Sequence, residues 1–332
     1  MNVKVLLYTE GMKYVSKSGL GRAIKHQMRA LTSAGVEYTL DPKDNYDIVH
    51  INSYGLKSRH LARKAHRQGK KVVYHAHSTE EDFRNSYIGS NLFSGLFGRW
   101  ITFCYPLGDA IITPTPYAKK LLQSYGIKKP IYPLSNGIDL NYYKSAEGDR
   151  ASFRKKYGYQ PQDKVIMSAG LWIQRKGILD FIKLAEELPQ YRFIWFGESD
   201  LRTVPPNIRK GIQQKPSNLI FAGYVDRESL RQAYAGSDLF FFPSYEETEG
   251  IVVLEALAMK IPVLVRDIPV YEDWLFDGVN VYKGNHNEEF KKKIIKILDG
   301  TLSDTTKAGY QTASERSIEQ IGKKLVEIYR NT

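Results

Sequence analysis

Short apolar runs alternate with amphipathic stretches along most of the chain. In its first part, apolar runs of strand length cover residues 3–8, 48–51, 71–74 and 110–113, and helical patterns cover residues 22–33 and 58–67. Uninterrupted runs rich in β-branched residues are typical of parallel strands that are buried on both faces. The alternation of such runs with helices therefore predicts an α/β fold, with a doubly wound parallel sheet between helices.

The same pattern starts again after a polar stretch over residues 139–163. A further helical pattern follows at residues 179–188, with five further apolar runs at residues 165–170, 193–196, 219–221, 239–242 and 263–265. We therefore expect two Rossmann-like domains, over residues 1–150 and 151–312, and a C-terminal helix over 313–332 that packs back on the first domain. In such a protein the ligand is expected in a central cleft, at the carboxyl ends of the strands.

The composition is that of an ordinary globular protein, with 42% hydrophobic and 25% charged residues among 332. Cys104 is the only cysteine, which excludes a disulfide framework and a cysteine-based zinc site and favours a reducing compartment. The chain contains no apolar run of about 18 residues, and its start lacks the features of a signal peptide. We therefore expect neither a secreted protein nor an integral membrane protein.

Positive charge is concentrated in the first half of the chain. The formal net charge is +12, and the first 150 residues hold 22 basic and 12 acidic side chains, against 26 and 24 in the rest. This asymmetry favours a polyanionic partner, either a nucleic acid or an anionic membrane, and it also fits a plain basic surface. Because no nucleic-acid-binding module is recognisable, we expect no nucleic-acid partner.

A loop with two glycines follows the first predicted strand and opens a helix. Gly19 and Gly21, preceded by Ser18, would let the backbone approach a ligand, and the helix N-terminus offers N–H groups to an anion. A dinucleotide-binding fingerprint needs a third glycine where Ile24 stands. The loop therefore argues against a nicotinamide dehydrogenase, and by itself it also fits a plain connection.

Two histidines stand at the end of the strand predicted over residues 71–74. His75 and His77 are two positions apart and share one face of an extended chain, so both can enter a site at the strand ends. None of the other histidines has a spacing that would complete a metal site. The pair is either structural, through hydrogen bonds, or functional.

A basic turn follows the first strand of the second half. Arg175, Lys176 and Gly177 stand before a predicted helix, where two cations and the free N–H groups of the helix suit a diphosphate. A solvated basic turn would have the same sequence.

The most specific signal is the string Pro-Ser-Tyr-Glu-Glu-Thr-Glu-Gly-Ile-Val-Val-Leu-Glu-Ala over residues 243–256. Glu247 and Glu255 lie on either side of Gly250 at a strand-to-helix junction. The glycine would leave the backbone amides of Ile251 and Val252 facing a sugar or a phosphate. Two glutamates at this spacing arise often by chance, but the whole string does not.

This string resembles the Glu-x7-Glu signature of the retaining, nucleotide-sugar-dependent glycosyltransferases of family 4, which have the GT-B fold. The resemblance extends over nearly the full chain, because residues 109–113 and 135–139 match the family's strand and its Asn-Gly-Ile-Asp element. The first half further resembles the bacterial diglycosyldiacylglycerol synthases, which add a second sugar to a monoglycosyl lipid. The segments that carry this second resemblance are residues 6–11, 17–23, 49–55, 77–83 and 88–91.

The resemblance implies roles for individual residues. By it, Glu255 binds the ribose hydroxyls and Glu247 contacts the donor sugar near its reacting face. Lys176 and Arg175 bind the diphosphate, and His77 binds a hydroxyl of the donor sugar and the positive charge that develops near the anomeric carbon. The other donor-binding residues that it implies are Gly19, Gly21, Gly250, Ile251, Val252 and, near the uracil ring, Val225.

Two positions depart from the family pattern. Leu171 stands where the family often has an arginine, so Arg175 is expected to replace that phosphate contact. Glu249 stands where the family has a phenylalanine before the signature glycine, which predicts an altered donor pocket.

The implied reaction is the transfer of glucose from UDP-glucose to α-monoglucosyl-diacylglycerol, giving α-glucosyl-(1→2)-α-glucosyl-diacylglycerol. A UDP-galactose donor, or a soluble polysaccharide acceptor, remains an alternative. Retention of configuration favours front-face displacement, and double displacement with Glu247 as nucleophile stays open. Because the chain has no Asp-x-Asp motif, no metal or other cofactor is expected to be obligatory, and Mg²⁺ is expected only as an activator.

Two segments of the first half favour peripheral binding to anionic lipids at the cytoplasmic side of the membrane. The first is a basic helical stretch over residues 56–67, and the second is an aromatic stretch over residues 83–105. A solvated helix and a buried helix would fit the same patterns. The expected membrane-binding residues are Lys57, Arg59, Arg63, Lys64, Arg67, Phe93, Phe97 and Trp100.

Overall fold

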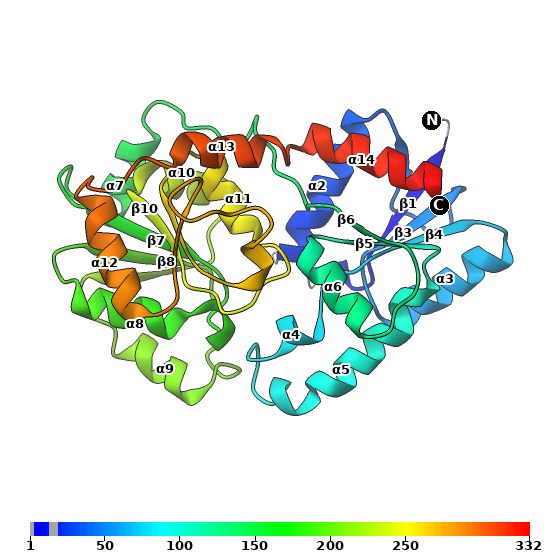
Figure 1. Cartoon of the computed structure of the whole chain (residues 1–332), viewed down its shortest axis with the longest axis horizontal. Coiled ribbons are helices and arrows are strands. Elements are labelled where there is room, and N and C mark those ends of the chain that lie inside the picture. The colour runs from blue at the N-terminus through cyan, green and yellow to red at the C-terminus, as the bar shows by residue number, and fades with distance from the viewer. Residues whose placement is uncertain (1–2, 13–18) are drawn as a thin grey trace. The chain divides into compact units, whose positions relative to one another are not determined.

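A computed structural model describes residues 3–12 and 19–332 of the chain. It divides into two compact units, each built on a six-stranded parallel sheet with helices on both faces (Figure 1). The first unit comprises Met1–Phe83, Leu92–Asp139 and Glu315–Thr332, and the second comprises Arg84–Asn91 and Leu140–Ser314.

The sheet of the first unit has the strand order β2-β1-β3-β4-β5-β6, and all of its pairs are parallel. Its strands are β1 (Lys4–Tyr8), β2 (Glu37–Thr39), β3 (Ile48–Ile51), β4 (Lys71–His75), β5 (Ala110–Thr113) and β6 (Ile131–Pro133). Its helices are α2 (Gly19–Ser33), α3 (Leu56–Arg67), α4 (Glu80–Phe83), α5 (Ser90–Cys104), η1 (Tyr105–Leu107), α6 (Pro116–Ser124) and α14 (Ile318–Asn331).

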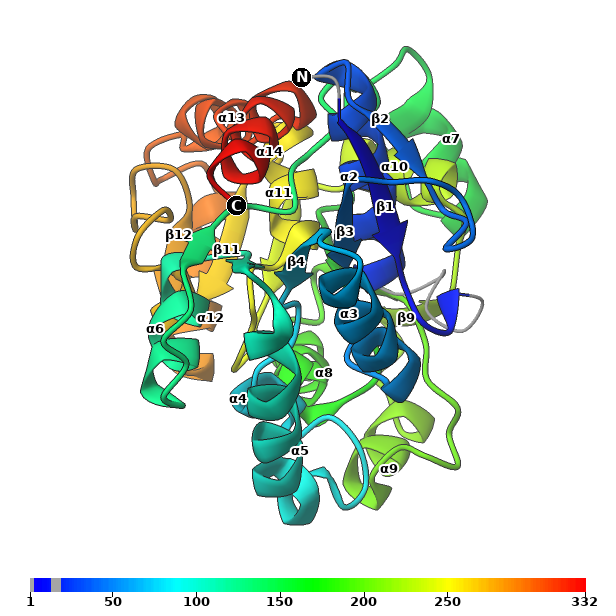
Figure 2. The same cartoon turned by 90° about the vertical axis from the view of Figure 1, so that its right-hand side faces the viewer.

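Alternate residues of each strand in this sheet belong to different cores. Leu6 of β1 packs in the core that contains the buried faces of α3 and α5, whereas its neighbours Val5 and Leu7 pack in the core that contains α2 and α14. The other strands repeat this alternation because successive side chains of a strand point to opposite faces. Both faces are therefore apolar, which explains the uninterrupted hydrophobic runs. Figure 2 shows the strands of this sheet between α3 and α14.

The sheet of the second unit has the strand order β12-β11-β10-β7-β8-β9 and is also parallel. Its strands are β7 (Val165–Ala169), β8 (Arg192–Phe196), β9 (Leu219–Gly223), β10 (Leu239–Phe242), β11 (Val263–Arg266) and β12 (Tyr282–Gly284). Its helices are α7 (Asp149–Tyr157), η2 (Gln174–Lys176), α8 (Ile178–Glu187), α9 (Pro206–Gln213), α10 (Arg227–Gly236), α11 (Ile251–Ala258), η3 (Pro269–Tyr271), α12 (Asn287–Leu298) and α13 (Thr306–Ser314).

The observed unit boundary differs from the expected one at residue 150. That position lies inside α7, and Asp149 at the start of this helix pairs with Arg231 of α10, whose Nη2 lies 2.9 Å from Oδ1. Such tertiary bonds attach residues 140–150 to the second unit, and a shift in composition does not reveal them. The segment Arg84–Asn91 also belongs to the second unit. At the other end of the chain, α14 packs against α2 and β1 in the first unit.

Three short strands were not predicted from the hydrophobic pattern. β2, β6 and β12 have three residues each and lie at sheet edges, where a run is too short to show a period. Among the helices of the described residues, none combines the length and the apolar character that a membrane crossing requires.

Candidate active site

A loop of the second unit, residues 243–250, connects β10 to α11 and carries the first part of the candidate site. Gly250 ends this loop as the N-cap of α11, with φ +90°. An L side chain rarely adopts this conformation, and a Cβ at this position would also lie 3.0 Å from the hydroxyl of Tyr271. The glycine therefore sets the turn that brings Ile251 and Val252 into the first turn of α11, where N–H groups have no helical acceptor.

Glu247 in this loop is buried, with 5% of its surface exposed, and is surrounded by cations. Its carboxylate pairs with the ammonium group of Lys176 and lies 3.7 Å from a guanidinium nitrogen of Arg175. The hydroxyl of Ser244 donates a further hydrogen bond of 2.6 Å to Oε1. Burial alone would raise the pKa of Glu247, but Lys176 and Arg175 outweigh it, so the net pKa lies below its ordinary value. The carboxylate is therefore ionised at neutral pH.

The two cations stand on η2, which follows β7, and Arg175 is fixed from several sides. Its Nε donates to the hydroxyl of Ser86 at 3.2 Å, its Nη1 donates to the carbonyl of Glu246 at 2.6 Å, and its backbone N–H donates to the carbonyl of Asn85 at 3.1 Å. All of these partners belong to the second unit. Arg175 thus joins three segments of that unit that are far apart in sequence.

Glu255, in the second turn of α11, is completely buried. The hydroxyl of Tyr143 donates to its Oε1 at 2.7 Å, and the hydroxyl of Tyr234 donates to its Oε2 at 3.0 Å. The side chain is therefore held rigidly below the N-terminus of the helix.

In the first unit, the expected glycines Gly19 and Gly21 form the first turn of α2. Gly21 is buried, and a side chain at Gly19 would meet no heavy atom within 4 Å. Ser18, which was expected to precede them in the same loop, lies outside the described residues.

His77 follows β4 and lies in a network of histidines and carboxamides. Its ring stacks on that of His75, with 3.9 Å between centroids, and its Nε2 lies 2.8 Å from Oδ1 of Asn52. Burial and the neighbouring His50 lower the pKa of His77 to about 3, and burial lowers that of His50 to about 3. The histidines are therefore neutral imidazoles at physiological pH.

The arrangement in the second unit can bind a doubly charged anion. Two cations, a helix N-terminus and a glycine turn lie beside an ionised carboxylate, the combination that positions a diphosphate and stabilises it as a leaving group. Within the described residues, no group of three or more histidine, cysteine, aspartate or glutamate side chains is arranged to hold a metal ion.

Comparison with known proteins decides the family. Residues 149–315 match the model of "Glycosyl transferases group 1", and residues 40–142 match that of "Glycosyltransferase Family 4". The chain is also 45% identical over 330 residues to a "Processive diacylglycerol alpha-glucosyltransferase" of Acholeplasma laidlawii, covering 99% of this chain and 98% of the relative. This chain belongs to the glycosyltransferase family.

More distant relatives of this glycosyltransferase include an "Alpha-galactosylglucosyldiacylglycerol synthase" of Streptococcus pneumoniae. It is 25% identical over 325 residues, which cover 95% of this chain and 86% of the relative. Among solved structures, Anabaena HepE in complex with UDP and glucose superposes with a TM-score of 0.79 at 16% identity, covering all of both chains. Sucrose-phosphate synthase from Thermosynechococcus elongatus gives a TM-score of 0.81 at 15% identity, covering 99% of this chain and 98% of the other. These likenesses show that the fold is GT-B.

The glycosyltransferase brings together several residues that were expected to bind the donor. Arg175 and Lys176 both pair with Glu247, and Gly250 and Glu255 stand on the adjoining turn and helix. Three further positions were singled out in the sequence, and Glu249 among them lies in the loop that carries Glu247. Val225 is half-buried between β9 and α10, Leu171 is 38% exposed beyond β7, and Glu249 is 2% exposed in the loop before α11.

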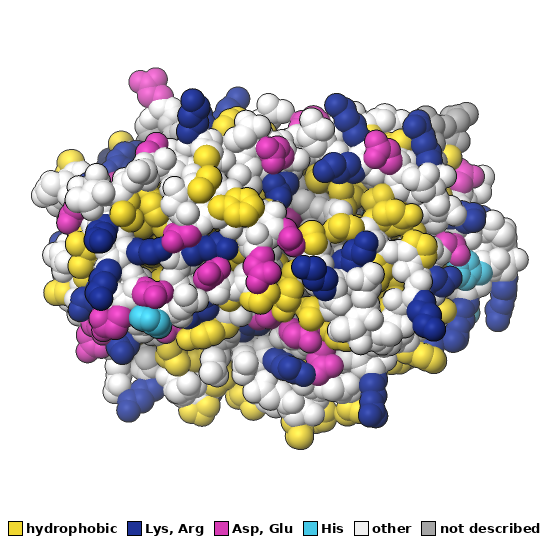
Figure 3. All heavy atoms as spheres, in the orientation of Figure 1, with side chains coloured by type: hydrophobic (Ala, Val, Ile, Leu, Met, Phe, Trp, Pro, Cys, Tyr) yellow, Lys and Arg dark blue, Asp and Glu magenta, His cyan; other side chains and the backbone are white. Residues whose placement is uncertain are grey.

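The expected membrane-binding residues of the glycosyltransferase fall into two groups. Lys57, Arg63, Lys64 and Arg67 are exposed on α3, and Figure 3 shows Lys and Arg side chains gathered over this helix. Arg59 is only 6% exposed, because its guanidinium packs on the rings of Trp100 and Phe103, at 5.1 and 3.7 Å from their centroids. The expectation that Arg59 faces a membrane is therefore wrong.

On α5 the expectation must also be corrected. Phe93 is 54% exposed, but Phe97 and Trp100 pack against the core beneath α3, and the indole N–H of Trp100 donates to the carbonyl of Tyr54 at 2.7 Å. The helix rotates these two rings inward because they lie on the face that carries Ile101 and Cys104. The large hydrophobic side chains that are exposed here are Tyr87, Ile88, Leu92, Phe93, Leu96 and Phe103.

Sequence reasoning missed the residues that support the functional groups. Tyr143 and Tyr234 hold Glu255, and His50 and Asn52 contact the histidines at the end of β4. The signal for the last two was present, since the run Ile48–Ile51 has a histidine in an otherwise apolar strand and Asn52 follows it directly. The tyrosines carry no such signal, because they are far from Glu255 in sequence.

Proposed function

We propose that this glycosyltransferase transfers glucose from UDP-glucose to α-monoglucosyl-diacylglycerol and forms α-glucosyl-(1→2)-α-glucosyl-diacylglycerol. The observation that carries the proposal is the 45% identity, over 99% of the chain, to a protein named as a processive diacylglycerol α-glucosyltransferase. The word "processive" in that name makes diacylglycerol itself a second acceptor to be tested. Because the glucose of UDP-glucose is α-linked and the product is α-linked, the reaction retains configuration.

The residues of the second unit support a role in leaving-group stabilisation. Lys176, Arg175 and the N-terminus of α11 supply positive charge for the β-phosphate as the bond from the anomeric carbon to its oxygen breaks. The acceptor hydroxyl forms its new bond on the face that UDP leaves, and its proton passes to the departing phosphate oxygen.

The surroundings of Glu247 favour this front-face displacement over double displacement. A nucleophilic carboxylate needs available lone pairs, whereas those of Glu247 accept contacts from Lys176, Arg175 and Ser244. Its charge is compensated by the cations that lower its pKa. The carboxylate therefore suits the positioning of Lys176 and Arg175 better than attack on the sugar.

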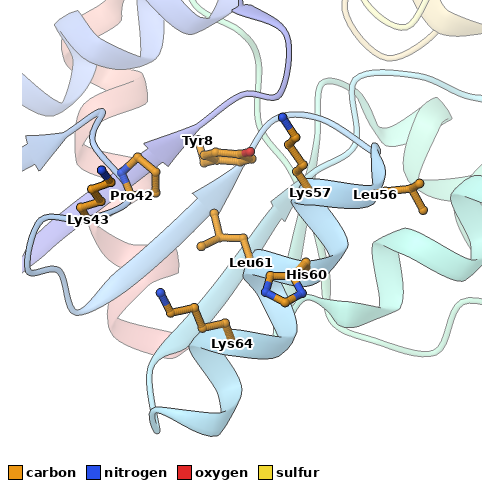
Figure 4. A pocket seen from close by; sticks show the side chains of 8 residues that line it. All are labelled: Tyr8, Pro42, Lys43, Leu56, Lys57, His60, Leu61 and Lys64. Atoms are coloured by element: carbon orange, nitrogen blue, oxygen red, sulfur yellow. The ribbon is translucent and has the colours of Figure 1, made fainter.

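We further propose that the enzyme binds anionic lipids at the cytoplasmic surface of the membrane. The exposed cations of α3 and the exposed apolar side chains of Leu92, Phe93 and Leu96 support it. A pocket of about 400 Å³ beside α3 has an apolar floor that includes Tyr8 and Leu61, with lysines around it (Figure 4). The lysines that line it are Lys43, Lys57 and Lys64, and they fit the phosphate of a lipid headgroup.

UDP-galactose is a second candidate donor. The observation in its favour is the S. pneumoniae relative, which is named as an α-galactosylglucosyldiacylglycerol synthase and matches 95% of this chain. Glucose and galactose differ in the orientation of one hydroxyl group, and the described contacts do not separate them.

A product assay tests the proposal. The full chain would be incubated with radiolabelled UDP-glucose or UDP-galactose and with α-monoglucosyl-diacylglycerol, diacylglycerol or glycogen, in micelles with phosphatidylglycerol. We expect labelled diglucosyl lipid from UDP-glucose, with a 1→2 linkage by NMR, and no labelled glycogen. Label in lipid only from UDP-galactose would replace the donor, and label in glycogen alone would overturn the lipid acceptor. Activity should persist in EDTA, since we propose that Mg²⁺ acts only as an activator.

A further inference from the structure

A continuous chain of hydrogen bonds runs through the first unit from α14 to the end of β4. The hydroxyl of Tyr329 lies 2.6 Å from Nδ1 of His50, and Nε2 of His50 lies 3.1 Å from Nδ1 of His75. Nε2 of Gln27 then lies 2.8 Å from Nδ1 of His75 and 2.8 Å from Oδ1 of Asn52. The same Oδ1 lies 2.8 Å from Nε2 of His77. The proposed catalytic histidine is therefore connected to a residue near the C-terminus.

The first link favours one protonation state of His50. Burial raises the pKa of Tyr329, so its hydroxyl keeps its proton. His50 is the hydrogen-bond partner of that hydroxyl among the described residues, and a hydroxyl that donates to Nδ1 requires an unprotonated Nδ1. Since a neutral imidazole carries one proton, His50 then carries it on Nε2. His50 therefore donates to Nδ1 of His75.

The remaining links follow from the first. An unprotonated Nδ1 on His75 requires Gln27 to turn its amide nitrogen, not its oxygen, toward that atom. The same nitrogen donates to Asn52, which must therefore present its carboxamide oxygen. A carboxamide oxygen only accepts, so His77 carries its proton on Nε2 and keeps a lone pair on Nδ1.

The opposite arrangement is also self-consistent and competes with this one. If His50 carried its proton on Nδ1, both carboxamides would turn over and His77 would carry its proton on Nδ1. In the first arrangement, Nε2 of His75 is a buried donor without an acceptor among the described residues, which is unfavourable. In the opposite arrangement the hydroxyl of Tyr329 accepts from Nδ1 of His50, and its own proton has no acceptor among the described residues. This hydroxyl therefore favours the first arrangement.

We infer that Tyr329 and His50 are positioning residues for His77. Through His75, Gln27 and Asn52 they fix the tautomer of His77, so that its Nδ1 accepts a hydrogen bond from substrate. The catalytic part of the inference rests on the proposed function and on the role that the family resemblance implies for His77, contact with a hydroxyl of the donor sugar. The tautomer is a property of the protein alone, so it can be tested without substrate.

The first test measures the tautomers in the free protein by ¹⁵N NMR of histidine-labelled full-length chain. In the native protein we expect Nδ1 of His77 to have the resonance of an unprotonated nitrogen. Tyr329→Phe removes one neutral hydrogen bond, a loss that corresponds to about a fivefold change in the ratio of the two arrangements. We expect that resonance to shift toward the protonated value in the variant. Tyr46→Phe removes the hydroxyl of another buried tyrosine of the same unit and should leave the His77 resonance unchanged.

A second substitution, at His50, should restore the native tautomer of His77 in Tyr329→Phe. In His50→Gln the amide nitrogen of glutamine reaches the place of Nε2 and can donate to His75 without a partner at position 329. Tyr329→Phe combined with His50→Gln should therefore restore the native His77 resonance, whereas Tyr329→Phe with His50→Leu should not. This pattern separates positioning from a general loss of stability, because both double variants lose the same tyrosine hydroxyl.

Kinetics provides the second test. Tyr329→Phe should lower kcat by about two- to fivefold with a smaller change in the KM for the donor, and adding His50→Gln should restore kcat. An unchanged His77 resonance in Tyr329→Phe would overturn the inference, whatever the activity. A shifted His77 resonance with unchanged transfer activity would show that Tyr329 controls the tautomer of His77. It would contradict the proposed role of His77 in the reaction.

Discussion

The pair formed by Lys176 and Glu247 shows how single residues act at the candidate active site. Both side chains are largely buried, with side-chain exposures of 15% and 7%. A buried ion pair contributes little net stability, but the loss of one member leaves the other charge without compensation. The pair therefore keeps a cation fixed and preorganised beside the glycine turn, which is useful for a leaving group that becomes more negative during the reaction.

Replacing Lys176 by methionine should damage both folding and donor binding. Burial would then dominate the pKa of Glu247 and raise it, since Lys176 is the largest influence that lowers it. Because Arg175 remains 3.7 Å away, we expect a loss of about 3 kcal/mol, at the lower end for a broken buried pair. Urea unfolding and calorimetric titration with UDP would measure the two effects.

Lys183→Met is the matched control, since Lys183 has an exposed side chain on α8 and a pair with Glu187 at 3.9 Å. It should change stability by less than about 1 kcal/mol and leave UDP binding intact. Equal losses in both variants would contradict the role given to Lys176.

Gly177 is the second residue on which the site depends. It has φ +73°, and a Cβ there would collide with the carbonyl of Pro243, at the start of the loop that carries Glu247. Gly177→Ala should therefore displace this loop and weaken UDP binding at least tenfold, besides its conformational cost of about 1–2 kcal/mol.

Gly300→Ala separates the two causes. Gly300 has nearly the same φ, +70°, but no heavy atom within 4 Å of its Cβ position. This control should show the conformational cost in thermal unfolding and bind UDP normally. If Gly177→Ala also bound UDP normally, the close contact with Pro243 would have no role in the site.

Among the elements, α3 has two faces of different character, an apolar inner face and a basic outer face. Leu61, Ala62 and Ala65 pack beneath the sheet of the first unit, while its outer face is strongly basic. Arg59 belongs to the inner face, because its charge is stacked on aromatic rings of α5. Of the basic residues of α3, Arg59 is therefore structural. The exposed ones are Lys57, Arg63, Lys64 and Arg67.

Neutralising the exposed cations of α3 should reduce binding to anionic vesicles. Each basic residue near a charged bilayer contributes about 1 kcal/mol, so the triple variant Lys57→Gln, Arg63→Gln, Lys64→Gln should bind vesicles of phosphatidylglycerol and phosphatidylcholine at least tenfold more weakly. Co-sedimentation at physiological salt measures this.

The control removes three charges from elsewhere in the same unit, at the exposed residues Lys120, Lys128 and Lys129. Equal binding by the two triple variants would mean that net charge, and not α3, attracts the protein to the bilayer. Binding of UDP should be the same in both, since α3 lies in the first unit and the cations of the donor site lie in the second.

For the molecule as a whole, the buried histidines make folding sensitive to acid. His50 and His75 are essentially inaccessible, and burial lowers the pKa of both, to about 3 for His50. In the unfolded chain they would titrate near 6.5. Below that pH the unfolded state binds protons that the native state does not, so stability falls as the pH falls through 6.5 and is constant above it.

The neutral histidines His50, His75 and His77 all lie in the first unit. We therefore expect this unit to be about 4 kcal/mol less stable at pH 5.5 than at pH 7.5, or about 1.4 kcal/mol for each histidine. Hydrogen exchange of peptides from β3 and β4, followed by mass spectrometry, would measure this difference. His50→Gln removes one of the three groups and should reduce the loss by about a third. Equal protection of these peptides at both pH values would contradict the burial of neutral histidines as the cause.

The sequence alone determined the fold class and the family. Fully buried strands such as β3 and β10 are visible as apolar runs because both faces of each sheet are covered. The string from Pro243 to Glu255 was recognisable because a turn, a cap and two carboxylates have to follow one another in the chain itself. Features that depend on neighbours in sequence are the ones that a sequence can show.

Only the tertiary structure decided which residues support the site. The pairing of Asp149 with Arg231, the hold of Tyr143 on Glu255 and the link from Tyr329 to His50 join positions that are 82, 112 and 279 residues apart. It also decided that Arg59, Phe97 and Trp100 face inward, because a short basic or aromatic stretch has no clear period that distinguishes a core face from a solvent face. Such choices depend on what packs against an element, and that partner is distant in sequence.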